Sequence, residues 1–167
     1  MGWTHAITQQ EIRVIKMRLQ DFEDYAISDF RPWEIARVGT DLKDVQVTVF
    51  VLAQKFRDEM DRRVKIISLT GGEHKPGSYH YLGRAMDFVL YLMDGPVDIY
   101  VVFKAALLAG FNGIGIYWNG KRFSFHVDTR SHYTFWCGHK KMNLGGERES
   151  KWTYIPLTLD ADYLKSL

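Results

Sequence analysis

The sequence has one cysteine, Cys137, among its 167 residues. One thiol cannot form a disulfide within the chain, and it cannot build a zinc cluster made of cysteines. Any metal that the protein binds must therefore take its ligands from histidine and carboxylate side chains. We interpret Cys137 itself as a small buried hydrophobic residue rather than as a nucleophile.

The sequence also lacks an excess of charge of either sign. Its 22 Lys and Arg residues stand against 20 Asp and Glu, so the formal net charge is +2, and the basic clusters, such as Arg62-Arg63 and Lys140-Lys141, are short. Nucleic-acid-binding proteins usually concentrate basic residues on one face. We therefore expect no nucleic acid among the partners, although a weakly basic protein is compatible with an anionic polymer such as a bacterial cell wall.

Long apolar runs and a secretory signal are missing as well. No run approaches the roughly 18 apolar residues of a membrane span. The first residues, MGWTHA, do not show the basic segment followed by an apolar segment that marks a signal peptide. We expect synthesis in the cytoplasm without a signal peptide and no insertion into a membrane. A target outside the membrane would then require release by another route.

The composition that remains is that of a folded globular protein. Apolar residues make up 46% and charged residues 25% of the chain, which are ordinary fractions for a soluble domain. Five Trp, nine Tyr and ten Phe are enough to fill a core and to line a groove for sugar or peptide. We predict a single domain over residues 1–167, with a helical lead-in (1–44), a motif-bearing core (45–136) and a tail packed on that core (137–167).

Helix signals mark the first part of the chain. A capping box at residues 8–11 predicts a helix to about Tyr25, with one apolar face formed by Ile12, Ile15, Leu19 and Phe22. Residues 28–44 contain Pro32 and Gly39 and are interpreted as a connection, and a second helix is predicted from about 45 to 62. A third helix is predicted to start with Pro96 at its first position and to end near Ala109, before Gly110.

Strand signals occupy the middle of the chain. β-Branched residues predict a strand at 64–69, a glycine-rich loop follows at 71–79, and alternation predicts a second strand at 84–90. Asn119-Gly120 predicts a hairpin between strands at 113–118 and 121–128, whereas the tail shows few clear elements. This order favours an α+β fold, a small antiparallel sheet with flanking helices.

Two short segments carry the chemistry, SYHYLGRAMD at residues 78–87 and FHVD at 125–128. His126 and Asp128 are two apart on a predicted strand, so their side chains share a face. His80 and Asp87 are seven apart and converge only if the chain bends between them, which Gly83 allows. Two histidines and an aspartate can hold Zn²⁺ and leave a position for water, the ligand set of a hydrolytic site.

The same residues have ordinary alternative interpretations. Asp87 would serve as a strand-edge carboxylate, and His126 with Asp128 as a hydrogen-bonded surface pair. In a metal site, Asp128 and Ser78 would instead orient the histidine ligands. The remaining histidines are weaker candidates. His74, with Glu73, is interpreted as a solvated loop residue in a loop that could overhang the site. His132 and His139 are interpreted as surface or packing residues, and His5 as uninformative.

The two segments resemble the zinc D-alanyl-D-alanine carboxypeptidases and L-alanyl-D-glutamate endopeptidases, which cut peptidoglycan peptides. The resemblance rests on Ser78-x-His80-x-x-Gly83-x-Ala85-x-Asp87 with His126-x-Asp128, and it covers about residues 45–136. It implies zinc on His80, Asp87 and His126, and a fold shared with the hedgehog signalling domain.

Two departures from that family pattern stand out. The family arginine that holds a substrate carboxylate is absent from residues 68–75, and we expect Lys75 or Arg84 to replace it, although a lysine lacks the bidentate fork. The usual carboxylate or histidine base before the last ligand is also absent. Asp128 is the best remaining base, followed by Glu73 or His74, with orientation of His126 as the alternative role for Asp128.

The sequence therefore predicts a zinc peptidase that cleaves stem-peptide or cross-bridge amides of bacterial peptidoglycan. Tyr117 is expected to donate a hydrogen bond to the oxyanion, with packing as its alternative role. The absence of a signal peptide predicts a bacteriophage endolysin or a virion-associated lysin. The alternative from another class is a non-catalytic zinc-containing module of the same fold, used for binding or as a structural virion component.

Overall fold

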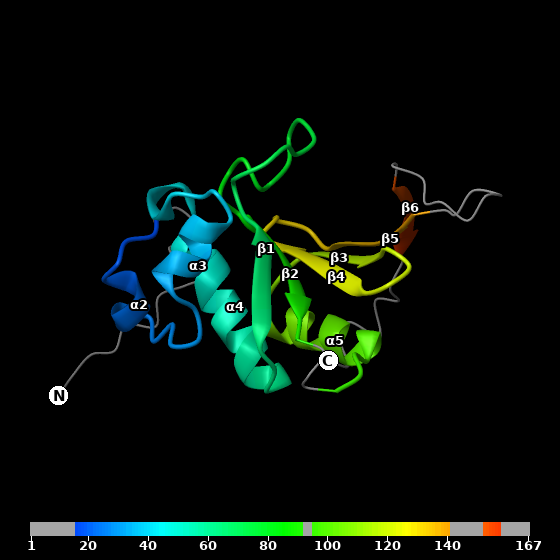
Figure 1. Ribbon diagram of the computed structural model, residues 1–167, viewed down its shortest axis with the longest axis horizontal. Coiled ribbons are helices and arrows are strands. Elements are labelled where there is room, and N and C mark those ends of the chain that lie inside the picture. Colours follow the sequence, from blue (N-terminus) through cyan, green and yellow to red (C-terminus); the bar gives the residue numbers. More distant parts are fainter. Residues whose placement is uncertain (1–15, 92–94, 141–151, 158–167) are drawn as a thin grey trace.

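The computed structural model describes residues 16–91, 95–140 and 152–157 (Figure 1). Its centre is one six-stranded sheet in the order β1-β2-β4-β3-β5-β6. The strands are β1 (Val64–Ser68), β2 (Ala85–Leu90), β3 (Gly113–Trp118), β4 (Phe123–Asp128), β5 (Thr134–His139) and β6 (Thr153–Leu157). The predicted α+β class is confirmed.

The sheet is mostly, rather than wholly, antiparallel. All neighbouring strands are antiparallel except β3 and β5, which run parallel. The exception arises at the start of β3, where Gly113 is in register with Asp128 of β4 on one side and with Thr134 of β5 on the other. The chain between β4 and β5 therefore passes around the end of β3, and β5 continues in the direction of β3.

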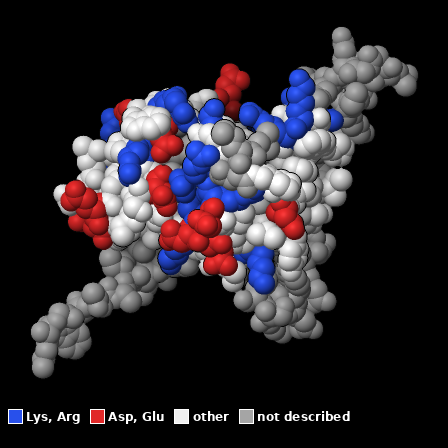
Figure 2. Space-filling view, turned by 60° about the horizontal axis from the view of Figure 1, so that its bottom comes forward, with Lys and Arg blue, Asp and Glu red and all other residues white. Residues whose placement is uncertain are grey.

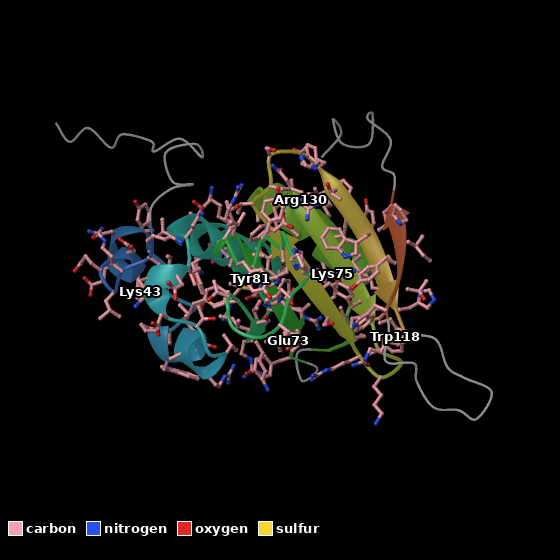
Figure 3. The ribbon with its side chains drawn as sticks, turned by 90° about the horizontal axis from the view of Figure 1, so that it is seen from above. Lys43, Glu73, Lys75, Tyr81, Trp118 and Arg130 are labelled. Atoms are coloured by element: carbon pink, nitrogen blue, oxygen red, sulfur yellow. The ribbon has the colours of Figure 1, made fainter. Side chains whose placement is uncertain are left out.

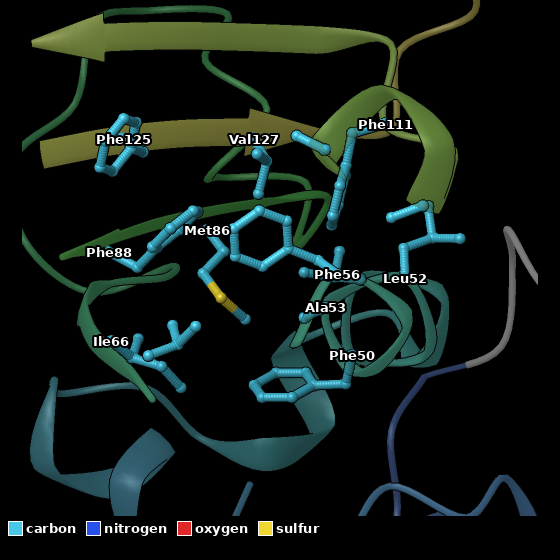
Figure 4. Packing of buried hydrophobic residues seen from close by; sticks show 14 of the residues in the cluster. Phe50, Leu52, Ala53, Phe56, Ile66, Met86, Phe88, Phe111, Phe125 and Val127 are labelled. Atoms are coloured by element: carbon cyan, nitrogen blue, oxygen red, sulfur yellow. The ribbon is translucent and has the colours of Figure 1, made fainter. Parts of the chain in front are cut away.

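Two longer helices, α4 (Val47–Met60) and α5 (Ile99–Ala109), contact each other and contribute to the core on one face of the sheet. Phe56 of α4 packs against Phe88 of β2, with ring centroids 5.2 Å apart, and Phe88 packs against Phe125 of β4. Figure 4 shows these side chains together. Because β-strand side chains alternate, burial of Phe88 and Phe125 on this face places Asp87 and His126 on the opposite face.

The helix boundaries confirm two predictions and correct a third. The predicted helix at 45–62 is α4, and α5 ends at Ala109, with Gly110 in the left-handed conformation at φ 105°. The start of α5 was misplaced, because the helix begins at Ile99 rather than at Pro96. Asp98 caps the helix, and its carboxylate accepts hydrogen bonds from the backbone N–H groups of Tyr100 and Val101.

The N-terminal part differs more from the prediction. Residues 16–20 are not helical, and α2 covers Asp21–Asp24 alone, while the rest of the expected helix lies outside the described residues. Leu19, expected on an apolar face, is 69% exposed. The buried carboxylate of Asp21 accepts a 2.6 Å hydrogen bond from the backbone N–H of Arg18, which stabilises a turn before the helix. This bond from a side chain to the backbone competes with the backbone bonds of a continuous helix at this point.

The connection and the tail also hold regular structure that was not predicted. The segment 28–44 contains α3 (Pro32–Arg37) and the 3-10 helix η1 (Leu42–Asp44), with Pro32 at the first helical position rather than as a breaker. The tail, predicted to have few elements, contains the second half of β5 and all of β6. Along the described residues, no helix has the length and apolar character needed to cross a membrane. The prediction of one domain over 1–167 stays a prediction.

Candidate metal centre

The strand register brings the two motif segments together. Asp87 of β2 is directly opposite His126 of β4 in the antiparallel pair. His80 reaches the same place through the bend expected at Gly83, which has φ +67°. A Cβ atom at Gly83 would overlap the backbone carbonyl of Asp44, so both the conformation and the close approach favour glycine.

The three predicted ligands converge on one point. Oδ1 of Asp87 lies 2.8 Å from Nδ1 of His126 and 3.2 Å from Nε2 of His80. The two histidine nitrogens are themselves 3.2 Å apart. In a tetrahedral zinc site with bonds of about 2.0–2.1 Å, donor atoms are about 3.3 Å from one another. The separations therefore fit a single ion held by these three side chains.

Hydrogen bonds on the far side of each ring fix which nitrogen is available. Nδ1 of His80 is 2.6 Å from the carbonyl oxygen of Leu69, to which it donates. Nε2 of His126 is 2.9 Å from Oδ2 of Asp128, to which it donates. Each arrangement turns the other nitrogen toward Asp87. Metal-binding histidines characteristically donate their second N–H to a carbonyl or a carboxylate in this way.

A third histidine belongs to the same cluster. His74, His80 and Asp87 each offer a ligand atom, and these atoms lie within 4.8 Å of one another. The His74 ring stacks on that of His80, with centroids 4.0 Å apart and planes at 4°. The interpretation of His74 as a solvated residue was wrong, because it is half-buried, whereas the expected overhang of its loop is present.

Tyr81 and Ser68 hold His74 in this position. The Tyr81 hydroxyl accepts a 2.9 Å hydrogen bond from the backbone N–H of His74 and donates another to its carbonyl. Nε2 of His74 lies 3.2 Å from the hydroxyl of Ser68. The sequence offered no periodic signal for these contacts, since they join a loop to a turn. A possible His-His-Asp metal site is the result that the described residues support.

Asp128 is held by more donors than the sequence suggested. It is fully buried, and Arg130 donates to it from Nε at 2.8 Å and from Nη2 at 2.6 Å. Burial would raise the pKa of Asp128, but hydrogen bonds from Arg130 and His126 hold it well below its usual range. Gly113 admits this carboxylate, because a Cβ atom there would overlap it. Sequence reasoning missed Arg130.

The hydrogen bonds of Asp128 suit its alternative role, in which it orients the His126 ring. Both of its oxygens already accept hydrogen bonds, and a carboxylate with a strongly depressed pKa is a weak proton acceptor. Its assignment as the general base stays a prediction that the described geometry does not favour. Glu73, a further candidate, is exposed and lines the same cleft.

The metal-free cluster carries a strong internal ion pair. Burial lowers the pKa of His126, but hydrogen bonds with Asp128 and Asp87 outweigh this effect and raise it to about 9. Partial burial would raise the pKa of Asp87, yet hydrogen bonds from His126 and His80 hold it well below its usual range. In the described structure, His126 and the carboxylates of Asp87 and Asp128 therefore form a largely buried charged cluster.

Tyr117 lies beside the cluster and keeps its proton. Burial raises the pKa of its hydroxyl, which accepts a 2.8 Å hydrogen bond from Nε1 of Trp136. The rings of Trp152 and Tyr154 pack edge-on against that of Tyr117. Both of the predicted roles, packing and hydrogen-bond donation toward the cleft, are compatible with this position.

The three residues predicted around the ligands have different surroundings. Ser78 accepts a 3.3 Å hydrogen bond from the backbone N–H of His80 and so supports that ligand. Lys75 is exposed on the cleft, with its ammonium 4.2 Å from the centre of the Tyr154 ring. Arg84 lies outside the cleft lining and donates to the hydroxyl and carbonyl of Thr129, so Lys75 is the better placed cation.

His74, His80, Asp87, His126 and Asp128 line one cleft of about 740 Å³. Figure 3 shows the molecule from above, with Lys75 between Arg130 and Glu73 in this view. The wall of the cleft includes the aromatic residues Tyr79, Tyr117, Trp136, Trp152 and Tyr154. Cys137 packs against the core as a small hydrophobic residue, as expected, although it is only partly buried. His132 is exposed, His139 is half-buried in β5, and His5 lies outside the described residues.

No family model, curated protein or solved structure matches this chain. The function proposed below therefore rests on the residues of the site, on their geometry and on the sequence motif.

Proposed function

We propose that this protein is a zinc-dependent peptidoglycan peptidase that cleaves a stem-peptide or cross-bridge amide. The observation that carries the proposal is the convergence of His80, Asp87 and His126 within 3.2 Å at the floor of the cleft. The motif that supplies these residues is the one that resembles the murein peptidases. A bound Zn²⁺ would supply Lewis acidity and a water of lowered pKa.

The chain itself supplies orientation and binding. The Leu69 carbonyl and the Asp128 carboxylate hold the two imidazoles in the tautomers that ligation requires. Tyr117 presents a protonated hydroxyl beside the cluster, and we assign it to the scissile carbonyl oxygen, where negative charge develops. Lys75, exposed at the cleft, is the cation that we assign to a substrate carboxylate.

The bacterial cell wall is proposed as the target because of the sequence motif, and the cleft is compatible with a peptide from that wall. Aromatic rings and cations around a volume of about 740 Å³ suit an extended peptide that bears both methyl groups and carboxylates. We further propose that the protein is a phage endolysin or a virion-associated lysin, which reaches the wall after release from the cytoplasm or within a virion.

A second candidate is a non-catalytic zinc module, and His74 is the observation that favours it. With His74 as a fourth protein ligand, the coordination would be closed, as in structural zinc sites, and no position would remain for water. The absence of the expected carboxylate base points in the same direction. The two candidates differ in one property, which is whether water can reach the metal.

The test uses purified peptidoglycan fragments, with the products identified by mass spectrometry. Zinc-loaded wild type should release one defined peptide product, and a chelator or His80→Ala should abolish release. His132→Ala, at an exposed histidine, is the matched control and should keep full activity. If wild type binds zinc but cleaves nothing, whereas His74→Ala opens the site to an exogenous ligand, the non-catalytic candidate holds and the peptidase proposal fails.

A further inference from the structure

A second hollow of about 350 Å³ lies at the opposite end of the strands from the metal centre. It is lined by Lys65, Val89, Leu90, Tyr91, Val97, Trp118, Lys121, Arg122 and Phe123. Arg122 precedes His126 by four residues along the strand direction, which corresponds to about 13 Å. The residues that line the hollow come from β1, from the end of β2 and the segment after it, and from the β3–β4 hairpin.

The charged side chains that line this hollow are all basic. They are Lys65, Lys121 and Arg122, and each is exposed. No carboxylate is among the described residues of the lining, although the whole chain is nearly neutral. Figure 2 shows Lys and Arg side chains near the centre of the face in view, with Asp and Glu side chains beside them on the surrounding surface. A hollow whose described lining has three cations and no carboxylate favours a ligand with negative charge.

An aromatic surface stands beside these cations. Trp118 and Phe123 are the last residues in register at the hairpin, and their rings pack with centroids 4.6 Å apart. Trp118 is nevertheless 39% exposed. An indole that keeps this much apolar surface in water at a rigid hairpin gives a flat platform for another apolar face. The C–H face of a pyranose ring is such a surface.

Charge and platform together select one class of ligand. We propose that this hollow binds an anionic carbohydrate chain, with a sugar ring on Trp118 and its carboxylates on Lys121 and Arg122. A neutral sugar would leave the cations unused, and an acidic peptide would leave the platform unused. If the proposed function holds, this site would bind stretches of the glycan strand whose lactyl carboxylates carry no peptide, about 13 Å along the strand from the metal centre.

Binding is tested with peptide-free glycan strands of peptidoglycan, whose lactyl carboxylates are free, in a calorimetric titration. Neutral chitooligosaccharides and poly-L-glutamate are the two comparison ligands. The protein is treated with chelator, so that binding is measured apart from any cleavage. We expect the protein to bind the glycan strands and to bind both comparison ligands at least about tenfold more weakly, a difference of about 1.4 kcal/mol in binding free energy. Equal binding of poly-L-glutamate, or of the neutral sugar, would overturn the proposal.

Variants locate the site. The double variant Lys121→Ala/Arg122→Ala changes two exposed side chains and should weaken glycan binding by at least about tenfold, because it removes both cations assigned to the carboxylates. Lys55→Ala, at an exposed position of α4 outside the hollow, should leave binding unchanged. Trp118→Ala tests the platform, with Trp118→Phe as a milder change if the first variant unfolds. Unchanged glycan binding in the double variant would refute this site assignment. Wild-type protein that binds glycan strands but cleaves no peptidoglycan would refute the proposed function alone.

Discussion

Asp87 and His126 face each other across neighbouring antiparallel strands, with Oδ1 2.8 Å from Nδ1. The contact does not depend on a mobile loop, because both residues belong to the central strands of the sheet. Rigid elements of this kind hold metal ligands more accurately than loops do. The loop contributes His80 and His74 to this fixed pair.

The role of Asp128 can be decided by Asp128→Asn, which keeps the shape of the side chain. If Asp128 orients His126, zinc affinity should fall by about 10–100-fold, as for other partners of metal-binding histidines. If it is the base, zinc affinity should stay and cleavage alone should be lost. Asp41→Asn, at an exposed carboxylate, is the control. Zinc titration of both variants, followed by the cleavage assay, separates the two roles, and we expect the first result.

The loop that carries His74 should be released by Tyr81→Phe. This change removes the hydroxyl that joins the backbone N–H and carbonyl of His74, at a cost of about 1 kcal/mol for these partly exposed bonds. We expect faster hydrogen exchange in residues 71–77, with the core unchanged. Tyr133→Phe, at a 59% exposed ring, is the control. Unaltered exchange in this loop would show that Tyr81 does not hold it.

Substitution of Gly83 by alanine should destabilise the protein more than the same substitution at another glycine with positive φ. Gly83→Ala meets both the left-handed conformation and the carbonyl of Asp44, whereas Gly77, at φ +78°, has open space around its Cα. We expect Gly77→Ala to lower the free energy of unfolding by about 1 kcal/mol and Gly83→Ala by about 3 kcal/mol or more. Urea denaturation of both variants gives this difference. Equal losses would mean that the close approach to Asp44 carries no weight.

Zinc binding should release a proton at neutral pH. In the metal-free protein, hydrogen bonds with both carboxylates outweigh the effect of burial and raise the pKa of His126 to about 9, so its imidazole is protonated at pH 7. The metal must displace the proton on Nδ1. Zinc affinity should therefore rise by up to about tenfold per pH unit from pH 7 and level off above pH 9.

Calorimetry in two buffers of different ionisation enthalpy measures that proton. If one proton is released, the apparent enthalpy of zinc binding should differ between the two buffers by about the difference between their ionisation enthalpies. The same heat in both buffers at pH 7 would contradict the assignment of His126 as a ligand that must lose a proton.

Local patterns in the sequence predicted the parts of the fold that depend on neighbouring residues. Asn119-Gly120 located the hairpin, and Gly110 located the end of α5. The two-residue spacing of His126 and Asp128 placed both on one strand, and the bend at Gly83 explained how His80 reaches Asp87. These features follow from backbone preferences and strand alternation, which a single sequence shows.

The remaining features depend on contacts between distant segments. The parallel pairing of β5 with β3 is fixed by the path around Gly113, which has no local signal. The clamp of Tyr81 on the His74 loop and the bidentate contact of Arg130 with Asp128 are likewise set by the tertiary structure. Arg130, two residues after Asp128, could have been suspected as its charge partner from the motif alone.

The most direct test of the central claim is the zinc content of the purified protein after dialysis, determined by native mass spectrometry. We predict one zinc ion per chain in the wild type and in His132→Ala, and none in His80→Ala, Asp87→Ala or His126→Ala. Wild-type protein without zinc would contradict the account, and so would zinc that is retained by His126→Ala but lost in His74→Ala.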